Sequence, residues 1–285
     1  MSRRVAITGA AGQLGRQLVR AFADAGDEVL SFTRPEWDIE SAESLERLVD
    51  WAPDVVVNSA AWTDVDGCAR EPERAMQVNG LAAGAVAEAA ARAGALSVQV
   101  STNEVFDGEL DRPYTEDDEP NPINPYGASK RRGEELVLAA NPRALVVRTA
   151  WLFGPGGVNF VTKILAAAER ARPLRVVDDE WGNPTWTPFL ADDIRALVEH
   201  GAPGVFHLAG QPPVSRFGWA RVVLDRRAEI EAIKLREFQR ASRVPPRAVL
   251  STTKAAAIGL PERGWKAPSV EVAAATAPGA FVERP

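Results

Sequence analysis

Residues 3–15 read RRVAITGAAGQLG, a short apolar run followed by three glycines, Gly9, Gly12 and Gly15. The run predicts a buried strand at 3–8, and the residues after Gly12 place apolar side chains at helical spacing. Glycines between a strand and a helix let the backbone approach a phosphate closely, and the first helical turn offers free N–H groups. The stretch therefore predicts a nucleotide-binding turn, although glycines also end strands for plain turn geometry.

Strands and helices alternate along the rest of the first half. Further strands are expected at 27–32, 54–61, 95–102 and 143–154, and helices at 12–26, 41–52, 72–94 and 124–141. This alternation predicts an α/β fold with a Rossmann-type, doubly wound parallel sheet.

The pattern loosens after about residue 150. A loop and helix are expected at 182–201, a strand at 204–210, and a loop with a short helix at 243–265. We therefore expect a dinucleotide-binding domain over residues 1–150, rejoined by some later segments. A smaller substrate-binding lobe is expected mainly over residues 151–285.

Composition excludes several classes of protein. The net charge of −6 argues against a nucleic-acid binder. The sequence has no run of about 18 apolar residues, so no membrane-spanning helix is expected. The N-terminus does not resemble a signal peptide, and Cys68, the single cysteine, cannot form an intramolecular disulfide. His200 and His207 are too few and too isolated to indicate a metal site. We expect a cytoplasmic protein without a metal, membrane or nucleic-acid partner.

The end of the second predicted strand indicates which dinucleotide is bound. An acidic side chain there would bind the ribose 2′-hydroxyl of NAD, whereas this strand is followed by Thr33 and Arg34. Arg34 favours the 2′-phosphate of NADPH, with NADH as the alternative cofactor and a solvated loop charge as the plain interpretation. Asp38 lies beyond the strand, within reach of an adenine pocket.

The segment PYGASK places Tyr126 and Lys130 four residues apart, on one face of a predicted helix. An ammonium group near a phenol lowers the phenol pKa, so Tyr126 could exchange a proton with a carbonyl oxygen while hydride moves at carbon. Ser101 and Thr102, at the end of the fourth strand, supply a hydroxyl for the same carbonyl. The alternative is a surface tyrosine and lysine on an amphipathic helix.

These motifs, with NSAAWTDVDGCAREPERAMQVN (58–79), STNEVFDG (101–108), VVRTAWLFG (146–154) and GNPTWTPFLADDI (182–194), resemble the dTDP-4-dehydrorhamnose reductase family of the extended short-chain dehydrogenase/reductase superfamily. The resemblance covers roughly the whole chain. It implies NADPH-dependent reduction of the C4 ketone of a dTDP-4-keto-6-deoxyhexose, dTDP-4-dehydro-L-rhamnose, to dTDP-L-rhamnose. It also implies a nucleotide-sugar substrate and a monomer or homodimer.

The resemblance implies roles for individual residues. The expected cofactor residues are Gly9, Gly12, Gln13, Leu14 and Gly15 at the pyrophosphate, Arg34, Asp38 and Ile39 at the adenosine, Ala60 and Ala61 beneath the cofactor, and Asn79 behind its binding loop. The expected catalytic residues are Thr102, Tyr126 and Lys130, of which Tyr126 and Lys130 also contact the cofactor. The expected substrate residues are Thr63, Val65, Asn103, Glu104, Trp151, Asn159 and Thr185.

Asn103 and Glu104 depart from the family, which usually has Asp and Tyr there. Related nucleotide-sugar 4,6-dehydratases have an Asp–Glu pair as acid and base, so Glu104 matches their base while Asn103 cannot act as an acid. A 4-epimerase or 4,6-dehydratase using Glu104 therefore stays an alternative, as does a non-catalytic NADP-binding regulatory subunit. We expect Glu104 to line the sugar pocket, so that Glu104→Gln changes KM more than the hydride step.

Overall fold

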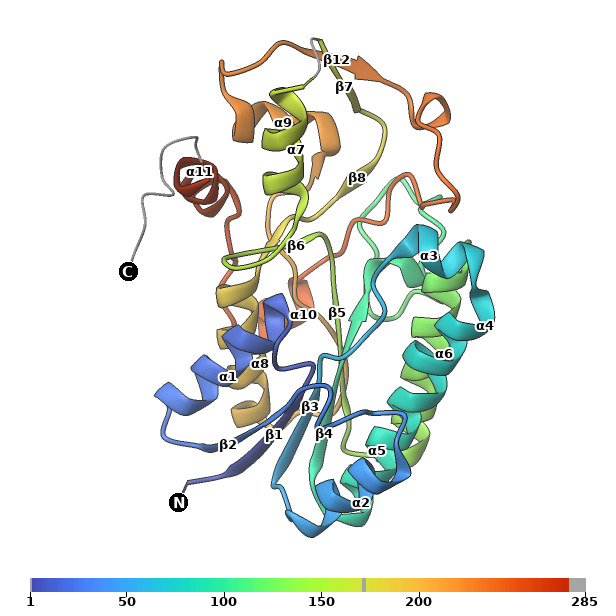
Figure 1. Cartoon of the computed structure of the whole chain (residues 1–285), viewed down its shortest axis with the longest axis vertical. Coiled ribbons are helices and arrows are strands. Elements are labelled where there is room, and N and C mark those ends of the chain that lie inside the picture. The colour runs from blue at the N-terminus through green and yellow to red at the C-terminus, as the bar shows by residue number, and fades with distance from the viewer. Residues whose placement is uncertain (1, 171–172, 277–285) are drawn as a thin grey trace.

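The computed structural model describes residues 2–170 and 173–276. Six parallel strands form the central sheet, in the order β10-β5-β4-β3-β1-β2 (Figure 1). They are β1 (Arg4–Thr8), β2 (Glu28–Phe32), β3 (Val55–Asn58), β4 (Leu96–Thr102), β5 (Leu145–Thr149) and β10 (Gly204–His207). The order reverses between β1 and β3, so the loops that leave these two strands diverge and open a crevice at the carboxyl edge.

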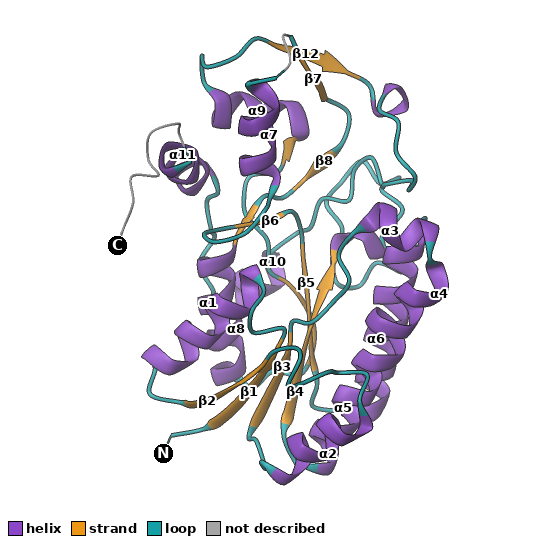
Figure 2. Cartoon of the chain, in the orientation of Figure 1, coloured by secondary structure: helices purple, strands orange, loops and turns teal. Residues whose placement is uncertain are grey.

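Helices cover both faces of the sheet, which confirms the predicted α/β, Rossmann-type fold (Figure 2). One face carries α1 (Gln13–Asp24) and α8 (Thr187–His200); the other carries α2 (Ala42–Asp50), α5 (Ala82–Arg92) and α6 (Pro125–Ala140). Leu18, Phe22 and Ile194 pack with the strands on the first face, and Leu48 and Val86 on the second. Burial of such side chains contributes about 1.5–3 kcal/mol each and fixes the helices on the sheet.

Two predicted elements are interrupted. The helix expected at 72–94 is α4 (Pro72–Ala75), a π-helical turn η1 (Met76–Leu81) and α5. The strand expected at 143–154 ends at Thr149, because Trp151 has a positive φ of 44° that breaks the extended backbone. The chain resumes as β6 (Leu152–Phe153), which pairs with β9 (Thr185–Trp186) and not with the central sheet.

The helices of the later segments divide between two hydrophobic clusters, while Ala209, Ala248 and Leu250 join a third. α8 and β10 join the sheet, with α10 (Thr253–Ala257) beside β10. α7 (Phe160–Ala168), β7 (Leu174–Val177), α9 (Arg216–Leu224) and α11 (Lys266–Ala275) pack around Trp219 in a separate cluster. The domain limits stay a prediction, and residues 277–285 of the expected lobe lie outside the described residues.

Short elements complete the lobe and the crevice edge. They are α3 (Val65–Arg70), η2 (Asn103–Val105), β8 (Trp181–Gly182), β11 (Val214–Ser215), β12 (Ile230–Ile233) and η3 (Leu235–Glu237). Residues 240–250, here called the crossing segment, contain no helix and run from the lobe back to the core. Within residues 2–170 and 173–276, every helix is too short or too polar to span a membrane.

Candidate active site

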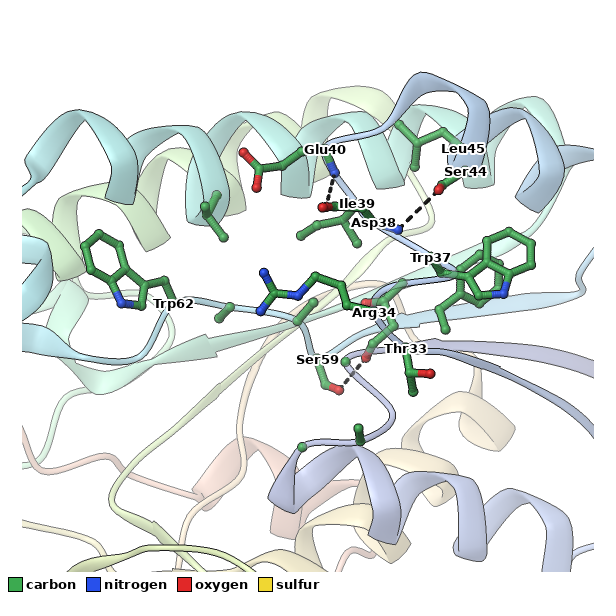
Figure 3. Close-up of a pocket in the computed structure, with 18 of the residues that line it drawn as sticks. Thr33, Arg34, Trp37, Asp38, Ile39, Glu40, Ser44, Leu45, Ser59 and Trp62 are labelled. Atoms are coloured by element: carbon green, nitrogen blue, oxygen red, sulfur yellow. Dashed lines mark hydrogen bonds between the residues drawn. The ribbon is translucent and has the colours of Figure 1, made fainter.

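A cavity of about 720 Å³ lies at the carboxyl ends of β1 and β3 (Figure 3). Its walls are the glycine-rich turn, the segment after β2 and the loop after β3. Of the predicted cofactor residues, those that line it are Gly9, Gly12, Arg34, Asp38, Ile39, Ala60 and Ala61. The sheet therefore gathers three segments that are far apart in the sequence around one crevice.

The glycine-rich turn needs its glycines for close packing. Gly9 has a φ of 67°, and a Cβ there would lie 2.8 Å from the backbone of Ala60. A Cβ on Gly15 would lie 2.1 Å from the Gly9 carbonyl oxygen. No side chain among the described residues caps the first turn of α1, so its N–H groups are available to an anion. This turn fits the pyrophosphate of a dinucleotide.

The side chains of Gln13 and Leu14 are engaged elsewhere and do not line the pyrophosphate site. Gln13 Nε2 donates a hydrogen bond to the Gly154 carbonyl (3.0 Å), and Leu14 is buried in the core. A pyrophosphate contact at these positions stays a prediction for their backbone N–H groups.

The wall after β2 holds one basic side chain, Arg34, and two acidic ones, Asp38 and Glu40. The Arg34 side chain extends across the pocket in Figure 3. Glu40, also in the wall, accepts two hydrogen bonds from Arg74 (3.0 and 3.1 Å), and Asp38 accepts one from the Glu40 N–H (3.0 Å). Because Arg74 neutralises Glu40, the guanidinium of Arg34 suits a 2′-phosphate. The residues present therefore fit NADP(H).

Asn79 fixes the loop that passes beneath the cofactor site. Its Oδ1 accepts the Trp62 N–H (2.8 Å), while its Nδ2 donates to the Trp62 carbonyl (3.0 Å) and to Ser129 Oγ (3.2 Å). Asn79 is buried and belongs to the π-helical turn, a distortion that frequently occurs at functional sites. These bonds fit the predicted supporting role.

Thr102, Tyr126 and Lys130 meet where β4 ends beside α6. Thr102 Oγ1 accepts the Glu104 N–H (3.2 Å) and so ends the strand. Lys130 is buried, and its Nζ donates to the Val100 carbonyl (2.7 Å). Burial lowers the pKa of Lys130 to about 8, although the negative charge of Glu134 acts in the opposite direction and raises it.

Lys130 alone does not lower the Tyr126 pKa; the prediction that it does so together with a cationic nicotinamide stays a prediction. Burial raises the pKa of Tyr126 above its ordinary value, the charge of Glu104 adds to the rise, and Thr102 opposes it. Lys130 Nζ donates to the Val100 carbonyl and is not among the groups that shift the Tyr126 pKa. Tyr126 is therefore a neutral phenol at pH 7, the form that donates a proton during ketone reduction.

Glu104 and Asn103 have different environments. Glu104 is half-buried, and Asn124 Nδ2 donates to its Oε2 (2.6 Å). Burial raises the Glu104 pKa to about 7 despite this bond. Asn103 is buried and donates to the Ala248 carbonyl (2.9 Å) in the crossing segment. Glu104 thus stays a candidate for the pocket wall, whereas Asn103 anchors the backbone.

Two side chains pack on the Trp151 ring. The Arg216 guanidinium lies 3.5 Å from the centre of the Trp151 ring, and Trp219 stacks with Trp151 at 5.9 Å between centroids. A sugar contact at Trp151 stays a prediction. Thr63 is exposed and Val65 is half-buried at the start of α3, so both stay predictions for the pocket.

Asn159 and Thr185 have clear structural partners. Asn159 caps α7 by accepting the N–H groups of Val161 (3.0 Å) and Thr162 (3.3 Å). Thr185 Oγ1 donates to the Asn183 carbonyl (3.0 Å) and accepts the Gly210 N–H (3.1 Å). A sugar contact at Asn159 or Thr185 stays a prediction that this geometry does not favour.

Sequence reasoning did not select four charged or polar residues around Glu104. Asn124 begins the helix predicted at 124–141 and carries no further signal. The charges of Glu180, Arg216 and Arg240 act on the Glu104 carboxyl from the lobe and the crossing segment. No local motif marks the last three, because only the tertiary fold brings them together. Among the described residues, no group of three or more His, Cys, Asp or Glu side chains could hold a metal.

Comparison with known proteins agrees with this geometry. Residues 3–277 match the family model described as RmlD substrate binding domain. The chain is 38% identical to dTDP-4-dehydrorhamnose reductase of Mycobacterium tuberculosis, over 99% of this chain and 96% of that protein. It is 43% identical to dTDP-4-keto-6-deoxy-D-glucose reductase of Streptomyces niveus, over 73% of each.

A crystal structure shows the same fold. The dTDP-4-dehydrorhamnose reductase of Bacillus anthracis, in complex with NADP, superposes with a TM-score of 0.90 at 30% identity, covering 95% of this chain and 98% of that one. The family match and the near-complete coverage confirm the predicted resemblance. This chain belongs to the RmlD family, the dTDP-4-dehydrorhamnose reductases of the extended short-chain dehydrogenase/reductase superfamily.

Proposed function

We propose that this protein is an NADPH-dependent oxidoreductase that reduces the C4 ketone of a dTDP-4-keto-6-deoxyhexose, converting dTDP-4-dehydro-L-rhamnose to dTDP-L-rhamnose. The observation that carries the proposal is the Tyr126–Lys130 pair on α6, set beside Thr102 at the end of β4 and near a crevice that fits NADP(H). Reductases of this activity, similar over nearly the whole chain, support it further.

The cofactor supplies the hydride that reduces C4 of the sugar. Tyr126 donates its phenolic proton to the ketone oxygen, so that carbonyl, hydride and proton together give a secondary alcohol. The Thr102 hydroxyl orients the carbonyl, and the Lys130 ammonium, one helical turn along α6, stabilises the phenolate that forms when Tyr126 gives up its proton. Arg34 holds the 2′-phosphate and favours NADPH over NADH.

The reductase relatives favour reduction over the epimerase, dehydratase and regulatory-subunit alternatives. One relative is named for dTDP-4-keto-6-deoxy-D-glucose, so the choice of hexose belongs to the proposal. We also propose a cytoplasmic location and a monomer or homodimer.

The test is a substrate panel with purified protein. NADPH oxidation is followed with dTDP-4-keto-L-rhamnose, dTDP-4-keto-6-deoxy-D-glucose and a UDP-4-keto sugar, and each is repeated with NADH. We expect turnover with a dTDP sugar and a higher kcat/KM with NADPH. No turnover with any ketosugar would refute the proposal, and NAD that co-purifies without net NADPH consumption would favour the epimerase or dehydratase alternative.

A further inference from the structure

Asn124, the residue before α6, joins three separate segments through one buried side chain. Its Oδ1 accepts the Gly127 N–H (2.7 Å) and caps the helix. Its Nδ2 donates to Glu104 Oε2 (2.6 Å) and to the Arg243 carbonyl (2.9 Å). One amide therefore bonds the first turn of α6, η2 directly after β4, and the crossing segment.

The backbones of the first two segments also touch. A Cβ on Gly127 would lie 2.0 Å from the Glu104 carbonyl oxygen, so the first turn of α6 packs directly on η2. Tyr126 lies between Asn124 and Gly127 in this turn. A shift of the turn relative to η2 would therefore move the phenol relative to Thr102.

The crossing segment is tied to both the core and the lobe. The Ser242 N–H (2.9 Å) and Arg240 Nε (3.2 Å) donate to Asp66 of α3. The Trp181 N–H of β8 donates to the Pro246 carbonyl (2.7 Å). Through Arg243 and Asn124, a change in the lobe can reach the turn that carries Tyr126.

The groups that face Glu104 come from every surrounding element. The charge of Glu180, before β8, raises the pKa of Glu104, while Arg240 of the crossing segment and Arg216 of α9 oppose this rise. Glu104 in turn raises the pKa values of Tyr126 and, on α3, of Cys68. The carboxylate that Asn124 binds therefore acts electrostatically on the proton donor, Tyr126.

We propose that Asn124 and Glu104 form a positioning pair that holds Tyr126 against the end of β4 and couples it to the crossing segment. This inference rests on the proposed reductase function. Asn124 itself touches no reacting atom, and it acts through the placement of the first turn of α6.

Asn124→Asp tests the pair without removing the helix cap, since aspartate caps as well as asparagine. The variant loses both donors and places a carboxylate beside Glu104. We expect kcat with NADPH and the best ketosugar to fall about tenfold or more. The pH dependence of kcat should also move to higher pH, because adjacent carboxylates raise each other's pKa.

The E104Q/N124D double variant reverses the polarity of the bond, since the new amide can donate to the new carboxylate. We expect its kcat to return to within about threefold of that of E104Q alone. The bond to the Arg243 carbonyl is not restored, so any remaining defect measures the link to the crossing segment.

Asn141 provides a matched control at the other end of α6. It is also buried, with Nδ2 donating to the Ala95 carbonyl (2.9 Å) and Oδ1 accepting the Arg143 N–H (3.0 Å). N141D loses the same kind of donor far from Tyr126. It should lower the melting temperature and leave kcat, KM and the pH profile unchanged.

The outcomes separate the two proposals. N124D with the kcat and pH profile of the wild type, or a loss that E104Q does not relieve, would overturn the positioning pair while the reductase function stands. A wild type that reduces no ketosugar would overturn the proposed function, and the pair with it.

Discussion

The cofactor crevice and the substrate side of the active site are built in different ways. Around the crevice, a glycine-rich turn and the segments after two strands supply most of the walls, and residues of α2, α4 and η1 complete them. On the substrate side, Glu104 at the end of β4 faces charges from α9, the segment before β8 and the crossing segment. The first site follows from local backbone geometry, whereas the second depends on long-range packing.

The difference shows in how side chains are used. Gly9 faces the cavity at a position where its φ of 67° and the Ala60 backbone, 2.8 Å from an added Cβ, disfavour any side chain. On the substrate side, Trp151 packs against Arg216 and Trp219, and Asn159 and Thr185 are bonded to nearby backbone groups. Substitutions in the crevice should therefore affect the cofactor selectively, whereas those on the substrate side should affect stability as well.

The largest effect is expected at Tyr126, where the two sites meet. Tyr126→Phe removes the proton donor and keeps the ring, so kcat should fall about 10²–10⁴-fold. The dissociation constant for NADPH, measured by fluorescence titration, should change little. A variant that keeps more than about a tenth of wild-type kcat would mean that another group supplies the proton.

Arg34 tests the crevice alone. Arg34→Ala removes a charged partner of the 2′-phosphate, which is worth about 1.5–3 kcal/mol, so KM for NADPH should rise roughly 10–100-fold. KM for NADH should stay nearly constant, and KM for the sugar should not move. Equal losses with NADPH and NADH would show that Arg34 does not read the phosphate.

Glu104 tests the substrate side through pH. The folded-state pKa of about 7 lies above the ordinary 4.5, so the stabilisation from protonated Glu104 is present below about pH 4.5 and is lost as pH rises through 7. The Glu104→Gln variant cannot titrate at this position. As pH rises from about 5 to about 8, its free energy of unfolding should therefore gain on the order of 2 kcal/mol relative to that of the wild type.

Denaturant unfolding at both pH values measures this difference, and the exposed Glu88→Gln variant controls for the loss of one charge. A constant difference between E104Q and the wild type across the range would place Glu104 in an ordinary aqueous environment.

The smallest effect is expected at Asn159, which the structure uses as a cap of α7. Asn159→Ala should lower the free energy of unfolding by about 1 kcal/mol and leave KM for the sugar unchanged. A rise in KM at unchanged stability would instead restore Asn159 to the sugar pocket.

The same contrast explains what the sequence can predict. The sheet, its flanking helices and the glycine-rich turn follow from periodicity and turn chemistry. The crevice residues Ile39, Ala60 and Ala61 were instead implied by the family resemblance. The break at Trp151 and the π-helical turn at Asn79 were missed, because each depends on tertiary contacts. No local motif marks Arg216 or Arg240, because each lies about 110 to 140 positions after Glu104 in the chain and only the fold brings it close. Lys130 had the expected place on α6 but an unexpected partner, the Val100 carbonyl.

The most direct test of the reductase assignment is the fate of the hydride. Purified protein is incubated with dTDP-4-keto-L-rhamnose and NADPH carrying deuterium at C4 of the nicotinamide, and the product is analysed by NMR. The assignment predicts dTDP-L-rhamnose with deuterium at C4 of the sugar, formed by the wild type and nearly abolished in Tyr126→Phe. Deuterium at another carbon, or a product formed without consumption of NADPH, would contradict it.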